Sequence, residues 1–120
     1  MHLSEAIWKG SKLRPQGFGK YYTAAGGSCA WGAAFEGAHC GILVPHLSHQ
    51  RWPVVGITSQ CPLCKESNTV ANLIVHLNDD HLWPREAIAL WVGRMEEMED
   101  RILPESVPAT AEKFDCHVGA

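Results

Sequence analysis

The sequence predicts a small domain of the α+β class that is mainly helical, and three observations support this fold class. The chain has 120 residues, of which 46% are hydrophobic and 19% are charged, a composition typical of one compact globular domain. Two segments in its second half repeat apolar side chains at the spacing of one helix face. A third segment, residues 41–59, is rich in β-branched residues and is interrupted by two prolines. We therefore expect helices with a little β structure.

Three regions are expected within this domain. Residues 1–59 form an amino-terminal region of helices and extended segments. Residues 60–103 form a zinc-finger-like unit, made of a knuckle and a helix, followed by a long amphipathic helix that packs on it. Residues 104–120, which contain two prolines, form an irregular tail.

The amino-terminal region is expected to begin with a short helix. Ser4 is a suitable N-cap, and Leu3, Ala6 and Ile7 supply apolar contacts. The segment RPQGFGKYY, residues 14–22, then ends the helix because its proline and glycines favour turns. A loop with aromatic anchors is therefore expected to follow.

Residues 29–38 form a second expected helix, with Ser28 as its N-cap. Most of its residues are small, so another element can approach this helix closely. Trp31 and Phe35 share one face because they are four residues apart. Two short extended segments are expected after this helix, at residues 42–44 and 54–58.

The second half of the chain contains the two amphipathic helices. The first is capped by Ser67 or Asn68, and its apolar face consists of Val70, Leu73, Ile74 and Leu77. The second has Pro84 in its first turn and ends before Pro104. Its apolar stripe consists of Ile88, Trp91, Val92, Met95, Met98 and Ile102. The charged residues expected on its opposite side are Arg85, Arg94, Glu96, Glu97, Asp100 and Arg101.

The apolar stripe of the second amphipathic helix has more than one interpretation. Stripes of this kind most often belong to the core. Trp91, Met95 and Met98 could instead form a partner-binding surface. The stripe could also seal a homodimer, because a chain of this length has little capacity to bury every apolar residue alone.

Cysteine and histidine residues next to the first amphipathic helix have the spacing of a metal site, C-x(2)-C-x(11)-H-x(4)-H. The four residues are Cys61, Cys64, His76 and His81. Zinc binds four such ligands in a tetrahedron. A gap of two residues turns both sulfurs inward from one knuckle, and a gap of four places both imidazoles near one end of a helix. The spacing predicts one structural Zn²⁺, because four protein ligands leave no open position for water.

Other interpretations of these residue types stay open. Cys61 and Cys64 could form a redox-active pair in which the histidines play no part. A catalytic metal would require that one histidine is not a ligand. A second metal site could be supplied by His39 with Cys40, or by Cys116 with His117.

The predicted finger lacks the surface of a DNA reader. Counting back from His76, the side chains that DNA-binding fingers point at bases are Thr69, Asn72 and Val75. Only Asn72 is suited to a base, namely adenine, and Asp79 and Asp80 would repel phosphate. A weak indication of nucleic-acid binding comes from the basic residues near the amino terminus, Lys9, Lys12, Arg14 and Lys20.

Cys29 is a candidate nucleophile. At the amino end of the second expected helix, the helix dipole would lower the pKa of its thiol. The surrounding GGSCAWG loosely resembles the G-S-C-W-A signature of cysteine proteases, although Ala30 intervenes before Trp31. The chain is far shorter than such proteases, and a small buried cysteine is the more common case.

The segments LSEAI, RPQGFG, SCAWGAAFEG, CPLC and VHLNDDHLWPREAIALWV together resemble a group of small uncharacterised proteins encoded by bacteriophages and prophages. The resemblance covers most of residues 3–93 and is most specific over residues 76–92. Relatives usually carry threonine or serine in place of Pro84, and these residues also begin a helix. The resemblance implies a mobile-element origin and the cytoplasm of a bacterial host, and it brings no assigned activity.

These observations lead to one main hypothesis and two alternatives. The main hypothesis is a non-enzymatic, zinc-stabilised protein that contacts a host or phage protein through the finger helix, the following helix, or both. One alternative is a nucleic-acid-binding transcriptional regulator that uses the basic amino-terminal segment and the finger. The other is a thiol-dependent enzyme built on Cys29. The sequence contains no apolar run long enough to span a membrane and no segment typical of a secretory signal, so a cytoplasmic location is expected.

Overall fold

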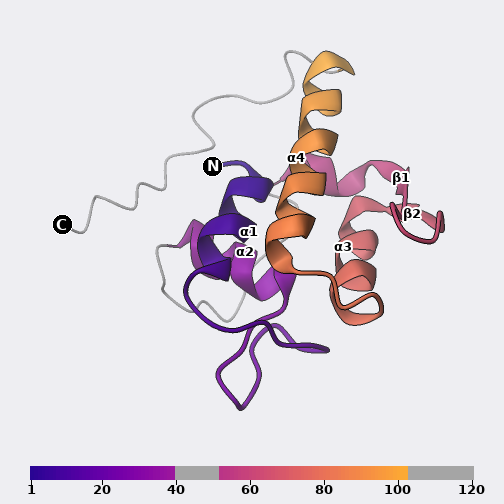
Figure 1. The fold of residues 1–120 in the computed structure, drawn as a ribbon. Coiled ribbons are helices and arrows are strands. Elements are labelled where there is room, and N and C mark those ends of the chain that lie inside the picture. The colour runs from indigo at the N-terminus through magenta and orange to yellow at the C-terminus, as the bar shows by residue number, and fades with distance from the viewer. Residues whose placement is uncertain (40–51, 103–120) are drawn as a thin grey trace.

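Helices dominate the computed structural model, which describes residues 1–39 and 52–102 (Figure 1). The helices are α1 (Leu3–Ser11), α2 (Ala30–Ala38), the 3-10 helix η2 (Pro53–Gly56), α3 (Val70–Asp79) and α4 (Arg85–Ile102). Two short strands, β1 (Thr58–Gln60) and β2 (Ser67–Thr69), pair antiparallel with Ser59 opposite Asn68. The α+β class with mainly helical content is therefore confirmed. The expected strand at 42–44 and the tail at 104–120 lie outside the described residues.

The backbones of α1 and α2 lie against each other with almost no side chain between them. A Cβ atom added to Gly10 would lie 1.7 Å from the Ala33 carbonyl oxygen, and one added to Gly37 would lie 2.1 Å from the Ala6 carbonyl oxygen. The close approach expected at the small residues of α2 is therefore confirmed. The glycines that make it possible had not been singled out in the sequence.

An aromatic cluster fills the core beside this helix pair. The ring centroids of Trp31 and Phe35 are 5.7 Å apart, so the shared face expected for these two residues is confirmed. Trp52, which precedes η2, lies 6.1 Å from Trp31 and 6.0 Å from Phe35 between ring centroids. The apolar faces of α3 and α4 complete the core with the fully buried side chains of Val70, Leu73, Ile74, Leu77, Ile88 and Val92.

The helix caps differ from those expected. α1 begins one residue before Ser4, and α2 is capped by Cys29, whose sulfur accepts a hydrogen bond from the Gly32 amide at 3.5 Å. Thr69, not Ser67 or Asn68, caps α3. The hydroxyls of Ser4 and Ser28 are not free to cap, because each bonds to a charged side chain of α4. Hydrogen bonds to distant side chains of α4 therefore take the place of the local caps expected at Ser4 and Ser28.

The expected strand at 54–58 is mostly a 3-10 helix. Pro53 begins η2, because its fixed φ suits the first turn of a helix, and the chain turns through Gly56 before β1 starts at Thr58. Ile57 is extended, and the strand itself therefore begins four residues later than expected and continues to the knuckle.

Three charged residues of α4 are buried, namely Arg85, Glu96 and Glu99, and the first two were expected to face solvent. Arg85 is 4% exposed and Glu96 is 7% exposed. The Glu96 carboxylate accepts hydrogen bonds from the hydroxyl and the amide of Ser4. Met98, expected on the apolar stripe, is 52% exposed, because α4 extends beyond the elements that cover its first half (Figure 1). The side chains of residues 100–102 lie outside the described part of the chain.

The buried guanidinium of Arg85 joins three parts of the chain. It donates hydrogen bonds to the carbonyl oxygens of Ser11 at 3.2 Å and Arg14 at 2.6 Å, and to the Ser28 hydroxyl at 2.8 Å. Asn78 of α3 holds the same loop, because its side-chain oxygen accepts hydrogen bonds from Gln16 and from the Ala30 amide. The loop between α1 and α2 is thus fixed to α3 and α4.

A membrane-spanning helix would have to be longer and more apolar than any helix within residues 1–39 and 52–102.

The contacts of the helical glycines predict opposite effects for two alanine substitutions. Gly10→Ala should lower the free energy of unfolding by about 1–3 kcal/mol or more, because the new methyl group would overlap the Ala33 carbonyl. Gly93→Ala should raise it by about 0.5–1 kcal/mol, because alanine favours the helix and the nearest atoms lie 3.7 Å from the added Cβ. Urea denaturation measures both values, and equal stabilities would contradict the close packing of α1 on α2.

Candidate metal centre

The loop between β1 and β2 places the two cysteine sulfurs. The Cys61 amide donates a hydrogen bond to the Glu66 carbonyl at 2.8 Å, and the Lys65 amide donates one to the Cys61 carbonyl at 2.9 Å. Lys65 has a φ of 69°, a left-handed conformation that closes the turn. The Leu63 amide lies 3.4 Å from the Cys61 sulfur and donates a hydrogen bond to it. This tight turn is the geometry in which a C-x(2)-C segment directs both sulfurs to one point.

The end of α3 places the two histidines. His76 lies in the last turn of the helix, and His81 follows the helix end at Asp79. The amides of Asp80 and His81 both donate to the His76 carbonyl, at 2.9 and 3.2 Å, so the chain folds back at this point. α3 itself is held by the buried residues of its inner face, which include Leu73 and Leu77. The gap of four residues therefore crosses the helix end and brings both imidazoles to the same side.

The four side chains converge with distances that suit one metal ion. One ligand atom from each of Cys61, Cys64, His76 and His81 lies within 4.8 Å of the others. His76 Nε2 is 3.3 Å from Cys64 Sγ and 3.1 Å from His81 Nε2. Tetrahedral bonds of ordinary zinc lengths would separate sulfur from nitrogen by about 3.5 Å and nitrogen from nitrogen by about 3.3 Å. The four residues are therefore close enough to hold one metal ion.

A carboxylate orients the central histidine. Asp80 Oδ2 lies 2.8 Å from His76 Nδ1, which leaves Nε2 directed toward Cys64 and His81. Metal-bound histidines commonly donate their second ring N–H to a carboxylate in this way. The sequence shows Asp80 four residues after His76, a spacing that places both side chains on one helix face. From the sequence alone, however, the charge of Asp80 predicts only repulsion of phosphate.

The metal-free site is also organised electrostatically. The hydrogen bond to His76 is the main reason that the pKa of Cys64 is lowered to about 6. The same contact with Cys64, followed by the contact with Asp80, raises the pKa of His76. The thiolate form of Cys64 is consequently favoured at neutral pH. Deprotonated sulfur is the form that binds metal, so little proton release opposes binding at Cys64.

The burial of the four side chains divides the site into an inner and an outer part. Cys61 is fully buried, whereas Cys64 is exposed and both histidines are partly exposed. The site therefore lies at the surface, with one side anchored in the core. Within the described ranges, this is the one group of three or more cysteine, histidine or acidic side chains spaced to hold a metal.

The other candidate site residues are not brought together in this way. Cys29 is buried, and burial raises the pKa of its thiol, so the expectation that the helix end lowers this pKa is wrong. Its sulfur is occupied in capping α2. Cys40, Cys116 and His117, proposed for a second metal site, lie outside the described residues.

Comparison of the chain with protein-family models, curated proteins and solved structures finds no match. The resemblance to phage-encoded proteins stays a prediction. The chemistry of the site and of the surface around it therefore carries the functional argument.

The contact between Cys64 and His76 predicts the pH response of the metal-free protein. Because the pKa of Cys64 is lowered to about 6, the thiolate contributes stability at higher pH, and this contribution is lost as the pH falls through that value. The raised pKa of His76 acts in the opposite sense, since its contribution is lost as the pH rises through the raised value. Alkylation by iodoacetamide, followed by mass spectrometry, should label Cys64 with a midpoint near pH 6.

Two comparisons test this assignment. His76→Ala should move the midpoint for Cys64 toward the ordinary thiol value of 9.0. The buried Cys29, whose pKa is raised, should stay unlabelled over the same pH range and serves as the internal control. A Cys64 midpoint that does not respond to His76→Ala would contradict the contact.

Proposed function

We propose that the protein is a non-enzymatic, zinc-stabilised binding protein of phage or mobile-element type, which acts through contact with another protein. The observation that carries the proposal is the convergence of four metal-ligating side chains within 4.8 Å. Zinc is the metal that best suits two thiolates and two imidazoles in a tetrahedron. With four protein ligands, the ion has no open position for a substrate or a catalytic water.

The zinc would act on the part of the fold that has least support of its own. β1 and β2 have three residues each, and an isolated two-stranded hairpin is at best marginally stable in water. Two of the four ligands come from the hairpin loop and two from the end of α3. The ion would therefore join hairpin and helix into one zinc-finger-like unit, with a contribution to folding on the order of 10 kcal/mol.

The surface of this unit favours a protein over a nucleic acid. The Thr69 hydroxyl accepts a hydrogen bond from the Asn72 amide as the α3 cap, and the Asn72 side chain donates to Asn68. Of the side chains that fingers present to bases, only the apolar Val75 is without such a role, and no arginine is present to read guanine.

The amino-terminal cations offer little charge to a phosphate backbone. Lys12 lies 3.3 Å from Glu86, Lys9 lies 3.6 Å from Glu5, and Arg14 is paired with the buried Glu36 at 2.8 Å. Neutralised cations release fewer counterions on binding DNA. These ion pairs count against the transcriptional-regulator alternative.

An apolar hollow beside α3 is the surface we assign to the protein partner. Val75 and Tyr21 are exposed by 45% and 46%, and Trp31 is buried beneath them. The hollow has a volume of about 370 Å³ and is lined also by Lys20 and Asp79. A bulky apolar side chain of a partner would fit such a hollow, while the two opposite charges fix its orientation. The resemblance to phage-encoded proteins supports a host protein as that partner.

Metal analysis tests the zinc assignment. The purified protein should contain about one equivalent of zinc, and a chelator should lower its melting temperature, because the metal is linked to folding. Cys64→Ala should reduce both the zinc content and the melting temperature, whereas the matched variant Cys29→Ala should retain the zinc. A metal-free Cys61→Ala/Cys64→Ala double variant with an unchanged melting temperature would overturn the site.

Paired surface variants test the docking face. Val75→Glu places a charge in the hollow and should weaken capture of a host protein at least about tenfold, because a buried unpaired charge is costly at an interface. Leu13→Glu, at an exposed apolar residue outside the hollow, is the matched control and should bind normally. Equal binding by both variants would place the partner elsewhere. Binding of mixed-sequence DNA that weakens steeply with salt would instead support the regulator alternative.

A further inference from the structure

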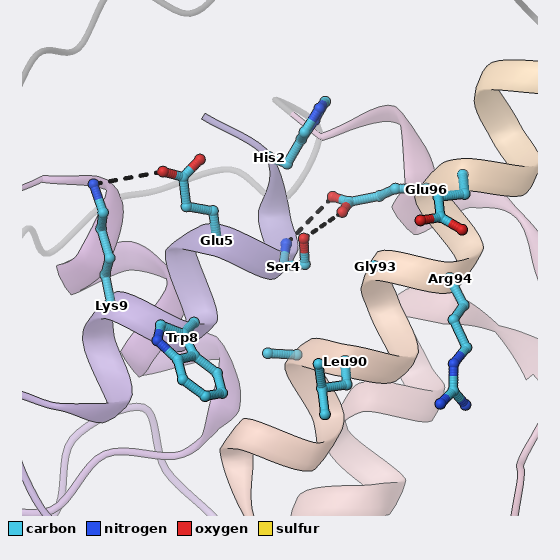
Figure 2. A pocket seen from close by; sticks show the side chains of 11 residues that line it. His2, Ser4, Glu5, Trp8, Lys9, Leu90, Gly93, Arg94 and Glu96 are labelled. Carbon is cyan, nitrogen blue, oxygen red and sulfur yellow. Dashed lines mark hydrogen bonds and ion pairs between the residues drawn. The ribbon is translucent and has the colours of Figure 1, made fainter.

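A groove runs between α1 and α4, away from the metal centre (Figure 2). Its volume is about 660 Å³. Trp8 of α1 and Leu90 of α4 lie on its two sides and are exposed by 43% and 61%. The residues between these two side chains are small, and they are Ser4, Ala89 and Gly93. The groove is therefore an open, partly apolar channel between two helices.

Gly93 contributes to this groove without being required by the fold. A Cβ atom at Gly93 would meet nothing closer than Ser4, at 3.7 Å, which is ordinary van der Waals contact. Gly10 and Gly37 differ, because a Cβ at either would collide with backbone atoms. Glycine inside a helix lowers stability relative to alanine. α4 thus carries a destabilising residue whose structural effect is to keep the groove deep.

The charges along the groove are of both signs. Glu5 and Lys9 on α1 already pair with each other at 3.6 Å. Arg94 and Glu97 of α4 are exposed. Across the described ranges, neither side chain makes a hydrogen bond or an ion pair. In Figure 2, Arg94 extends from the outer side of α4, one helix turn beyond Leu90. These two opposite charges, three residues apart on one helix, are available to a partner.

We propose that the α1–α4 groove is a self-association surface and that its occupant is a second copy of this chain. A surface with charges of one sign would select an oppositely charged partner, whereas a surface carrying both signs is complementary to itself. In a two-fold symmetric dimer, residue i contacts residue j of the other copy and j contacts i. Two antiparallel α4 helices related by an axis between residues 95 and 96 would place Arg94 of each copy opposite Glu97 of the other.

The apolar side chains of the groove add contact area beside these two ion pairs. Trp8 and Leu90 line the same groove as the charged residues, and tryptophan and arginine are enriched among the residues that dominate binding energy at interfaces. The small residues between them let the second copy approach closely. This dimer uses α1 and α4 and is independent of the zinc proposal, because none of the four candidate zinc ligands lines the groove.

Sedimentation equilibrium of the full chain, over micromolar to millimolar concentrations, tests the proposal. The unmodified protein should show a monomer–dimer equilibrium. R94E and E97R should each raise the dimer dissociation constant at least about tenfold, because each variant opposes two like-charge contacts. An equimolar mixture of R94E and E97R should form a heterodimer, because each of the two charge pairs between the copies then again joins an acidic to a basic side chain.

The controls separate association from folding. Circular dichroism should show that both variants keep the helical content of the unmodified chain, as expected for exposed side chains that make no hydrogen bond or ion pair in the described structure. K20E changes an exposed charge outside the groove and should leave the dimer dissociation constant unchanged. A chain that stays monomeric at every concentration would overturn the proposal, as would a dimer insensitive to R94E. A mixture of the two variants that fails to associate would exclude the antiparallel pairing.

Discussion

The buried guanidinium of Arg85 is the interaction on which the arrangement of the helices depends. It stands at the first residue of α4 and bonds to the end of α1, to the following loop and to the residue before α2's cap. Burial lowers its pKa, since a charge is costly away from water. Such a cation is tolerated only where oxygen atoms surround it in fixed positions. The end of α1, the loop that follows it and the residue before the cap of α2 must therefore meet at the start of α4.

The two halves of the molecule are stabilised by different means. α1 and α2 are held by backbone contact and by an aromatic cluster, which together bury a continuous apolar core. The hairpin has six paired residues and few apolar side chains, so burial alone gives it little stability. A metal ion held between its loop and the end of α3, as we propose, would supply what the hairpin lacks. Metal chemistry in this chain is accordingly interpreted as architecture, at the place where the hydrophobic core ends.

Local pattern in the sequence predicted the features that depend on local spacing. The repeat of Val70, Leu73 and Leu77 predicted α3, and the spacing of two cysteines and two histidines predicted that they would converge. Features set by distant residues were not predictable in this way. Ser4 and Ser28 resemble caps, but their hydroxyls serve Glu96 and Arg85, which lie 92 and 57 positions away in the chain.

The contact between α1 and α2 also limits how this sequence can change over evolution. At Gly10 and Gly37 each helix presents bare backbone to the other, so no flexible side chain can move aside to admit a larger neighbour. A larger side chain at either position can be accommodated only by separating the two helices. This separation would disturb the aromatic cluster beside them. Substitutions at these two positions should thus be purged in natural lineages.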